Sequence, residues 1–235
     1  MPASGESRIA IVTGGAGALG AAVTGRLLGD GATVCVPVEH ARDADRLRAG
    51  VPAVARERLT TQVVDVRDLD AMTAFVETVA QRHGRIDILV TLVGGFAGGA
   101  LLETDRATWD QMLAVNLTST FVATRAVVPH MVRAGRGRIV TIASRAAVPP
   151  TGGFIAYTTA KAGVLAFTEA LAHEMRGHGV TVNTVLPSTM DTPANRAAMP
   201  DSDRKGWVPV ESVADVIAFL VRDESAHVTG ALLTI

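Results

Sequence analysis

Short apolar runs alternate with longer segments of helical periodicity along almost the whole chain. Runs of about four to eight apolar, β-branched residues indicate buried strands, whereas apolar positions three and four residues apart indicate amphipathic helices. Strands are predicted near Ile9–Thr13, Thr33–Val38, Thr61–Val64, Ile86–Val90, Arg138–Ala143, Thr181–Val185 and Ala231–Ile235, and helices near Leu19–Leu28, Asp43–Ala49, Leu69–Arg82, Arg106–Val132, Phe154–Arg176 and Val213–Val221. The alternation predicts a Rossmann-type, doubly wound α/β fold: one parallel sheet of about seven strands with helices on both faces.

The alternation has no linker, so we expect a single domain over residues 8–235, after a flexible N-terminus of residues 1–7. Only residues 188–209 interrupt it, with several prolines, mixed charge and Trp207. A long irregular stretch in a compact domain is usually a functional loop, although a surface insertion has the same composition. The stretch follows a strand end, where parallel sheets bind ligands, so it is predicted to be a substrate loop that includes Trp207.

Composition narrows the class of protein. Of 235 residues, 48% are hydrophobic and 19% charged, which supports a large core, and a net charge of −1 provides no cationic surface for nucleic acid. We expect no membrane span, because no uninterrupted apolar run reaches about 18 residues, and no secretion signal is evident. The only cysteine is Cys35, and the histidines show no ligand spacing, so we expect no disulfide, no metal and a cytoplasmic location.

A glycine-rich turn follows the first predicted strand and leads into a helix, in the order Thr13-Gly14-Gly15-Ala16-Gly17-Ala18-Leu19-Gly20. Such a turn lets a pyrophosphate approach the backbone and the free N–H groups of the helix N-terminus. Its position after a strand and before a helix makes dinucleotide binding the preferred interpretation over simple tight packing. The predicted cofactor contacts here are Gly14, Gly17, Leu19 and Gly20.

The end of the second predicted strand bears on the choice between the two nicotinamide cofactors. Glu39, directly after Val38, can accept a hydrogen bond from a ribose hydroxyl and would repel a 2′-phosphate. Arg42 could instead turn towards such a phosphate. The sequence favours NAD(H) over NADP(H). Asp65, after the third strand, is either a contact to the adenine edge or a solvated turn carboxylate.

Tyr157 is the single tyrosine and lies four residues before Lys161, one of only two lysines. On a helix this spacing puts both side chains on one face, where an ammonium is expected to lower the pKa of a phenol and adapt it to general acid–base catalysis. Ser144, at the end of a predicted strand, can reach the same crevice and bond a substrate oxygen. Singly, these residues have ordinary structural roles. Together, beside a glycine turn, they predict an active site.

These marks together resemble the short-chain dehydrogenase/reductase family from about Arg8 to the C-terminus. The resemblance implies hydride transfer between a nicotinamide and a small-molecule carbonyl or alcohol, by a homotetramer or homodimer. It further implies that Tyr157 is the proton donor, that Lys161 also binds the nicotinamide ribose, and that Ser144 holds the substrate oxygen. Asn116, within Val115-Asn116-Leu117, is implied in a proton relay, and further cofactor contacts are implied at Val66, Gly94 and Thr192.

The resemblance has departures. Thr91-Leu92-Val93-Gly94 stands where the family usually has Asn-Asn-Ala-Gly, and this loop and residues 191–200 resemble dihydropteridine reductase, a member of the same superfamily. A quinonoid dihydropterin reductase, with Phe96 stacked on the flat ring, is therefore an alternative, as is packing of Phe96 under the loop. A non-catalytic nicotinamide-nucleotide redox sensor is a second alternative. Association is expected through the two long helices, whose apolar residues include Leu165, Phe167 and Leu171.

Overall fold

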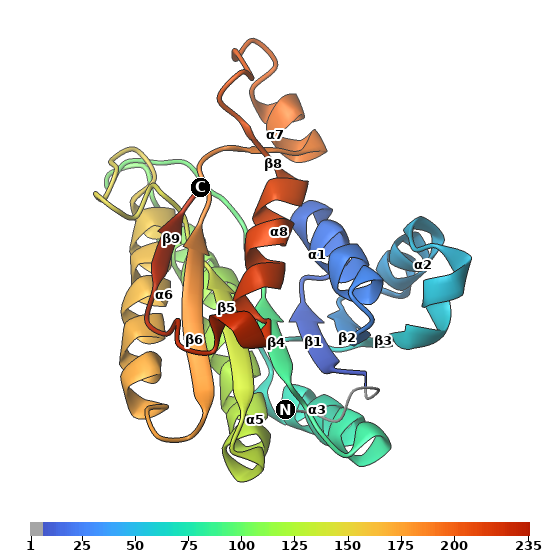
Figure 1. The fold of residues 1–235 in the computed structure, drawn as a ribbon. Helices are drawn as coiled ribbons and strands as arrows, with labels where there is room; N and C mark the ends of the chain where they lie inside the picture. The colour runs from blue at the N-terminus through green and yellow to red at the C-terminus, as the bar shows by residue number, and fades with distance from the viewer. Residues whose placement is uncertain (1–6) are drawn as a thin grey trace.

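A computed structural model describes residues 7–235 (Figure 1). The N-terminal segment expected to be flexible therefore falls almost entirely outside the described residues. Seven parallel strands form one sheet in the order β3-β2-β1-β4-β5-β6-β9. The strands are β1 (Ile9–Thr13), β2 (Thr33–Val38), β3 (Leu59–Val63), β4 (Ile88–Thr91), β5 (Gly137–Ile142), β6 (Val180–Leu186) and β9 (Leu232–Thr234). The predicted doubly wound sheet is confirmed, and the order reverses between β1 and β4, where such sheets bind ligands.

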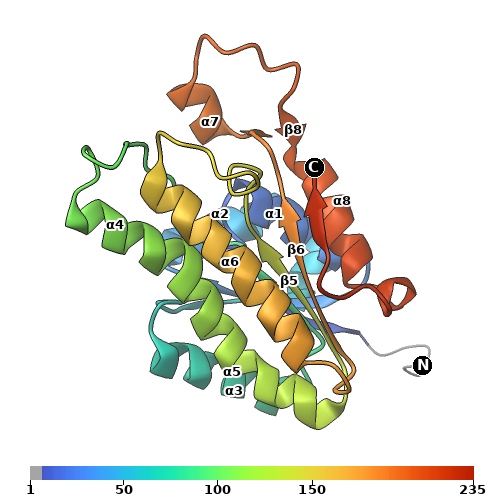
Figure 2. The ribbon, with the colours of Figure 1, turned by 90° about the vertical axis from the view of Figure 1, so that its left-hand side faces the viewer.

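Helices cover both faces of the sheet (Figure 2). One face carries α1 (Ala18–Gly29), α2 (Ala41–Gly50) and α8 (Val210–Leu220), and the other carries α3 (Leu69–His83), α4 (Arg106–Leu113), α5 (Ser119–Ala134) and α6 (Ile155–Glu174). Single turns of 3₁₀ helix lie at Ala53–Arg58 and Asp223–Ser225. The two layers account for the continuous apolar character of the central strands, which are buried on both sides.

The two faces of β1 show how one strand serves both cores. Ala10 and Val12 pack in the core beneath α1 and α8, whereas Ile9 and Ile11 pack in the core beneath α3 and α5. Because successive side chains of a strand point to opposite faces, both sets must be apolar. Burial of the strands fixes the register, and with it the position of the residues that follow each strand.

Two predicted elements differ in the structure. The helix predicted over Arg106–Val132 is divided by a π-helical turn at Ala114–Thr118, which separates α4 from α5. The stretch 188–209 is not irregular throughout. It contains the paired short strands β7 (Met190–Asp191) and β8 (Val208–Pro209) and the helix α7 (Pro193–Ala198), and it projects beyond the sheet in both ribbon views (Figures 1 and 2).

A local cap accounts for α7. Thr192 is extended, its hydroxyl accepts a hydrogen bond of 3.1 Å from the backbone N–H of Asn195, and Pro193 takes the first helical position. A threonine cap followed by proline is a helix-start pattern that could have been read from the sequence. Its six residues give too little periodicity for the hydrophobic pattern to show it.

The apolar faces of the long helices also differ from expectation. Leu165 and Leu171 on α6 were expected to help form an outward face, but both are buried in the chain's own core. Phe167 is only partly buried, and its ring meets the ring of Phe121 on α5 edge-on at 6.5 Å. Phe121 is 46% exposed and is the residue that presents apolar surface outward.

The helical run Arg106–Ala134 is long and apolar enough to cross a membrane by length and composition. Half of its most apolar window is buried inside the structure, as in the core helix of a globular domain. This feature is therefore weak evidence for a membrane span.

Candidate active site

A groove of about 420 Å³ opens at the carboxyl ends of β1, β2, β3 and β4. Six predicted cofactor contacts line it: Gly14, Gly17, Glu39, Asp65, Val66 and Gly94. The other lining residues are Ala16, Pro37, Val38, Asp43, Arg46, Val64, Arg67, Leu92, Val93, Gln111 and Val115. The structure thus brings residues from five chain segments to the topological switch point of the sheet.

The glycine turn fits a nucleotide pyrophosphate. The first N–H groups of α1 lack intrahelical partners and adjoin Gly14 and Gly17, which line the groove. Gly20 lies behind them, and a Cβ built there would be 2.0 Å from the Gly14 carbonyl oxygen. Any larger residue at Gly20 would force the turn apart, so the turn and helix keep this shape only with glycine.

Leu19 and Thr192 are among the predicted cofactor contacts that do not line the groove. Leu19 points its side chain into the core, so it can meet a nucleotide only through its backbone at the N-terminus of α1. Thr192 is buried and uses its hydroxyl to cap α7. For both residues, contact with the cofactor stays a prediction.

The adenosine end of the groove holds ion pairs that the sequence analysis did not identify. Arg67 donates to both carboxylate oxygens of Asp65, each at 2.9 Å, and this contact lowers the pKa of Asp65. Arg46 forms an ion pair with Asp43 through Nη2 at 2.9 Å, and the same Nη2 donates a hydrogen bond of 3.1 Å to the Ala16 carbonyl. The three-residue spacing of Asp43 and Arg46 on a predicted helix was the available signal.

Glu39 and Arg42 take different positions. Glu39 lines the groove, and its charge contributes to raising the pKa of Arg67. Arg42, weighed above as a phosphate contact, is exposed and is not among the residues that line the groove. The roles considered for Glu39 and Arg42 both stay predictions.

The predicted catalytic side chains converge beside this groove. Ser144 lies just beyond β5, and its hydroxyl bonds to that of Tyr157, from the first turn of α6. Lys161 follows one turn later, is only 4% exposed, and its Nζ lies 5.9 Å from the centroid of the Tyr157 ring. Nζ also donates a hydrogen bond of 3.1 Å to the carbonyl of Ile142, at the end of β5.

The pKa of Tyr157 moves in the opposite direction from the one expected. Burial raises the pKa of the phenol, and the hydrogen bond from Ser144 offsets only part of this effect. Burial also lowers the pKa of Lys161 to about 8. The ammonium lies near the ring and bonds a backbone carbonyl, so desolvation dominates at the phenol. The expectation that Lys161 makes the phenol more acidic is wrong for this arrangement of side chains.

Asn116 joins the loop after β4 to the π-helical turn. Its Nδ2 donates to the carbonyls of Gly95 and Met112 at 3.1 and 3.0 Å, and its Oδ1 accepts from the N–H of Gly95 at 3.3 Å. The side chain is buried, and π-helical turns recur at functional sites. Asn116 therefore positions the loop, and its implied part in proton relay stays a prediction.

Gly94 connects the groove to the catalytic side chains. It lines the groove, and a Cβ built on it would lie 2.8 Å from Oδ1 of Asn116 and 3.3 Å from Nζ of Lys161. The close approach requires glycine at this position, although Thr91 and Leu92 stand where the family usually has two asparagines.

Aromatic rings border the phenol on its open side. The ring of Phe96 meets Tyr157 edge-on, with centroids 5.0 Å apart, and lies 5.6 Å from Phe154. Phe96 is 65% exposed, so it does not pack under its loop, and it can meet a substrate held at Tyr157. Backbone bonds between Gly99 and Gly153 join the two loops that carry Phe96 and Phe154. Phe154 had no separate signal in the sequence, because it was counted as the start of a helix.

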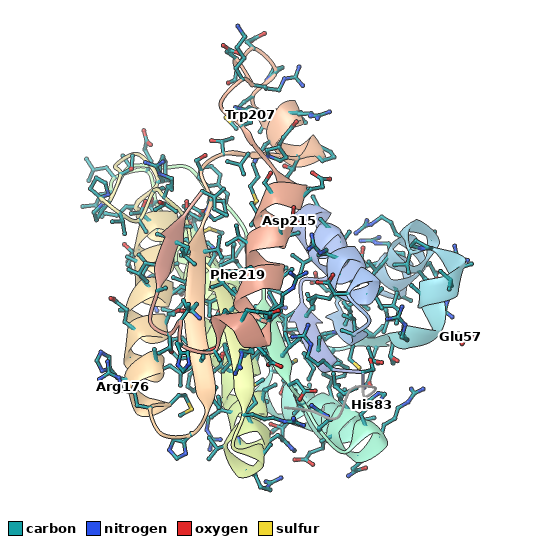
Figure 3. All side chains as sticks on the ribbon, viewed as in Figure 1. Glu57, His83, Arg176, Trp207, Asp215 and Phe219 are labelled. Atoms are coloured by element: carbon teal, nitrogen blue, oxygen red, sulfur yellow. The ribbon has the colours of Figure 1, made fainter. Side chains whose placement is uncertain are left out.

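Trp207 lies in the projecting segment, near its return to β8 (Figure 3). Its backbone N–H bonds to the Arg204 carbonyl at 3.0 Å, and its side chain is partly buried. Contact between Trp207 and a substrate stays a prediction.

The chain belongs to the short-chain dehydrogenase family, whose model matches residues 8–203. It is 33% identical over 242 residues to the 3-oxoacyl-(acyl-carrier-protein) reductase FabG of Thermotoga maritima, covering 98% of this chain and 96% of that protein. It is 36% identical over 241 residues to the acetoacetyl-CoA reductase of Allochromatium vinosum, with 97% of each chain covered.

Solved structures agree in fold. Levodione reductase superposes with a TM-score of 0.90 at 26% identity, covering 97% of this chain and 95% of that chain. NAD⁺-bound xylitol dehydrogenase superposes with a TM-score of 0.88 at 25% identity, with 97% of each chain covered. The chain is an oxidoreductase that acts with a nicotinamide cofactor on a carbonyl or alcohol.

Proposed function

We propose that this enzyme interconverts a ketone and a secondary alcohol with NAD(H), using Tyr157 as the general acid and base. The observation that supports this most directly is the position of Gly94, which belongs to the nucleotide groove and abuts both Asn116 and Lys161. A nucleotide in the groove would therefore end beside Tyr157 and Ser144.

Each catalytic side chain has a distinct task in this proposal. In reduction Tyr157 donates its proton to the substrate oxygen, and in oxidation it takes that proton back. Ser144, already bonded to the phenol, shares that oxygen and orients it. Lys161 offers its remaining N–H groups to the nicotinamide ribose while its bond to Ile142 holds it in place. The nicotinamide, when bound, supplies or accepts the hydride.

The charges in the groove support NAD(H). Its two guanidinium groups, of Arg46 and Arg67, are each paired with an aspartate, and the carboxylate of Glu39 is additional. The local balance is therefore negative where the ribose 2′ position is expected, beside the end of β2. A 2′-phosphate would meet net repulsion there, whereas a 2′-hydroxyl could donate a hydrogen bond to Glu39.

Assembly and location complete the proposal. A second copy of the chain is proposed to pack against the exposed surface around Phe121 and Phe167, giving a homodimer or homotetramer. The single cysteine, Cys35, is buried, and burial raises the pKa of its thiol to about 11, so the thiol is unreactive. Because one cysteine forms no disulfide within the chain, we assign the enzyme to the cytoplasm.

A nicotinamide absorbance assay tests the proposal. The panel should hold ketones, secondary alcohols, a 3-oxoacyl thioester and a quinonoid dihydropterin, each with NAD(H) and NADP(H). We expect turnover of a ketone and alcohol pair with higher kcat/KM for NAD(H). A higher value for NADP(H) would contradict the proposed cofactor.

The same assay addresses the two alternative functions. The exposed ring of Phe96 beside Tyr157 favours a planar substrate, so turnover confined to the quinonoid dihydropterin would replace the ketone proposal with pterin reduction. Tight nucleotide binding without turnover of any substrate would identify a redox sensor. The contact between Ser144 and Tyr157, with Lys161 beside them, argues against a sensor because binding alone does not need these groups.

A further inference from the structure

The adenosine end of the groove contains an arginine in an unusual position. Arg46 comes from α2, yet its guanidinium reaches the glycine turn, where Nη2 donates to the carbonyl of Ala16 at 3.1 Å. The same Nη2 forms an ion pair with Asp43 at 2.9 Å, and both residues line the groove. This cation therefore lies between the glycine turn and the end of β2, which frames the expected site of the adenosine ribose.

We propose that Asp43 is a specificity-determining residue for the nucleotide: it neutralises Arg46 and thereby excludes a ribose 2′-phosphate. The inference rests on the proposed function, because it assumes that the groove binds a nicotinamide nucleotide. It adds a second determinant to Glu39, located on a helix and acting through an arginine.

The chemistry of the pair supports this role. A guanidinium is a preferred partner for phosphate oxygens, so Arg46 without Asp43 would be an available phosphate ligand. With Asp43 in place, its carboxylate forms an ion pair with Arg46 at 2.9 Å, and its negative charge lies beside the guanidinium that a phosphate dianion would approach. A neutral ribose 2′-hydroxyl needs no free cation to bind it and is not repelled by the carboxylate of Asp43.

The rest of the groove does not provide a replacement cation. Arg67 is held by two hydrogen bonds to Asp65, and Glu39 adds a further negative charge beside it. Removing the charge of Asp43 is therefore the single change that frees an arginine next to the glycine turn. Removing the carboxylate of Glu39 would reduce the repulsion of a 2′-phosphate, but it would free no hydrogen-bond donor to bind that phosphate.

Binding of two fragments tests the inference without catalysis. Adenosine 5′-monophosphate and adenosine 2′,5′-bisphosphate differ only in the 2′-phosphate, and calorimetry measures the Kd of each. For Asp43→Asn we expect about tenfold tighter binding of the bisphosphate, as for one charge-assisted hydrogen bond regained, and monophosphate affinity unchanged within about twofold. Adding Arg46→Gln to Asp43→Asn should abolish the gain.

Asp45→Asn is the matched control, because Asp45 is an exposed aspartate of the same helix that is not among the groove-lining residues. Asp43→Ser provides a second neutral replacement if the asparagine variant does not fold. An unchanged bisphosphate Kd in Asp43→Asn, an equal gain in Asp45→Asn, or a gain that survives Arg46→Gln would each overturn the inference. Failure of wild type to bind either fragment or any nicotinamide nucleotide would instead overturn the proposed function on which it rests.

Discussion

The ammonium of Lys161 lies 5.9 Å from the centre of the Tyr157 ring and donates a hydrogen bond to the backbone carbonyl of Ile142. The spacing of the two residues on α6 puts them on one face, and the sheet edge decides what the ammonium contacts. Lys161 is thereby anchored to β5 while the phenol bonds Ser144.

Replacing Tyr157 with phenylalanine removes the proposed proton donor and leaves the ring contacts with Phe96 and Phe154 in place. We expect kcat to fall by ~10²-fold or more, the scale of general acid catalysis, while NADH affinity changes little. Steady-state kinetics and nucleotide fluorescence titration measure the two quantities. A variant with wild-type kcat would show that another group handles the proton.

Tyr157 is the only tyrosine, so ultraviolet absorbance reports the titration of this one phenol. Burial raises its pKa, so the phenolate of the nucleotide-free folded enzyme should form above pH 10, later than in the unfolded chain. Because the folded state then holds its proton more tightly, the stability from this group is present below pH 10 and is lost as the pH rises through the raised pKa. A titration at or below pH 10 in the folded enzyme would refute the dominance of desolvation.

Burying the ammonium of Lys161 costs stability at neutral pH. Its pKa of about 8 lies below the ordinary 10.5, so the unfolded chain binds more protons between these values, and stability rises with pH across this window. Lys161→Met should stabilise the fold by about 2 kcal/mol at pH 7, after allowing for the lost hydrogen bond to Ile142, and abolish activity.

Denaturant unfolding at pH 7 and pH 10 measures the effect of Lys161→Met, and the gain should shrink at the higher pH. Lys205→Met is the control, because Lys205 is the other lysine and is exposed. If Lys161→Met is less stable than wild type at pH 7, or if its gain in stability does not depend on pH, then burying the ammonium of Lys161 costs no stability.

Gly94→Ala should impair the site without replacing a catalytic group. The added Cβ would meet Oδ1 of Asn116 at 2.8 Å and Nζ of Lys161 at 3.3 Å, so Asn116 must shift and its bonds to Gly95 must stretch. Displacements of this size in a catalytic constellation lower kcat/KM by about tenfold or more. Gly98→Ala in the same loop is the control, because a Cβ at Gly98 meets nothing within 4 Å. Equal kinetics for the two variants would remove the proposed positioning role of Gly94.

Phe121→Gln should weaken self-association, because Phe121 is the exposed ring of the pair it forms with Phe167. Sedimentation velocity at micromolar concentration should show a smaller species than wild type. Leu102→Gln serves as the control, since Leu102 is 98% exposed on the loop before α4. A wild-type monomer, or an unchanged distribution for Phe121→Gln, would exclude assembly through this surface.

The fold was largely predictable because its determinants are local or periodic. Apolar strands buried on both faces, a glycine turn and amphipathic helices are readable from neighbouring residues, and all seven strands of the sheet were expected. The π-helical turn was not readable, since its apolar pattern continues that of α4 and α5. The same limit applies to the outward face of α6, because periodicity alone does not say which apolar stripe meets the core.

The sequence by itself determined which residues carry the chemistry: one tyrosine four positions before a lysine, a serine at a strand end and a glycine turn after the first strand. Tertiary structure alone decided how those groups behave. It brought the locally formed pairs Asp43–Arg46 and Asp65–Arg67 into one groove, turned Phe96 towards Tyr157, and buried the phenol so that its pKa rises. The physical reason is that desolvation and charge pairing depend on every group within a few ångströms, and most of those groups come from distant parts of the chain.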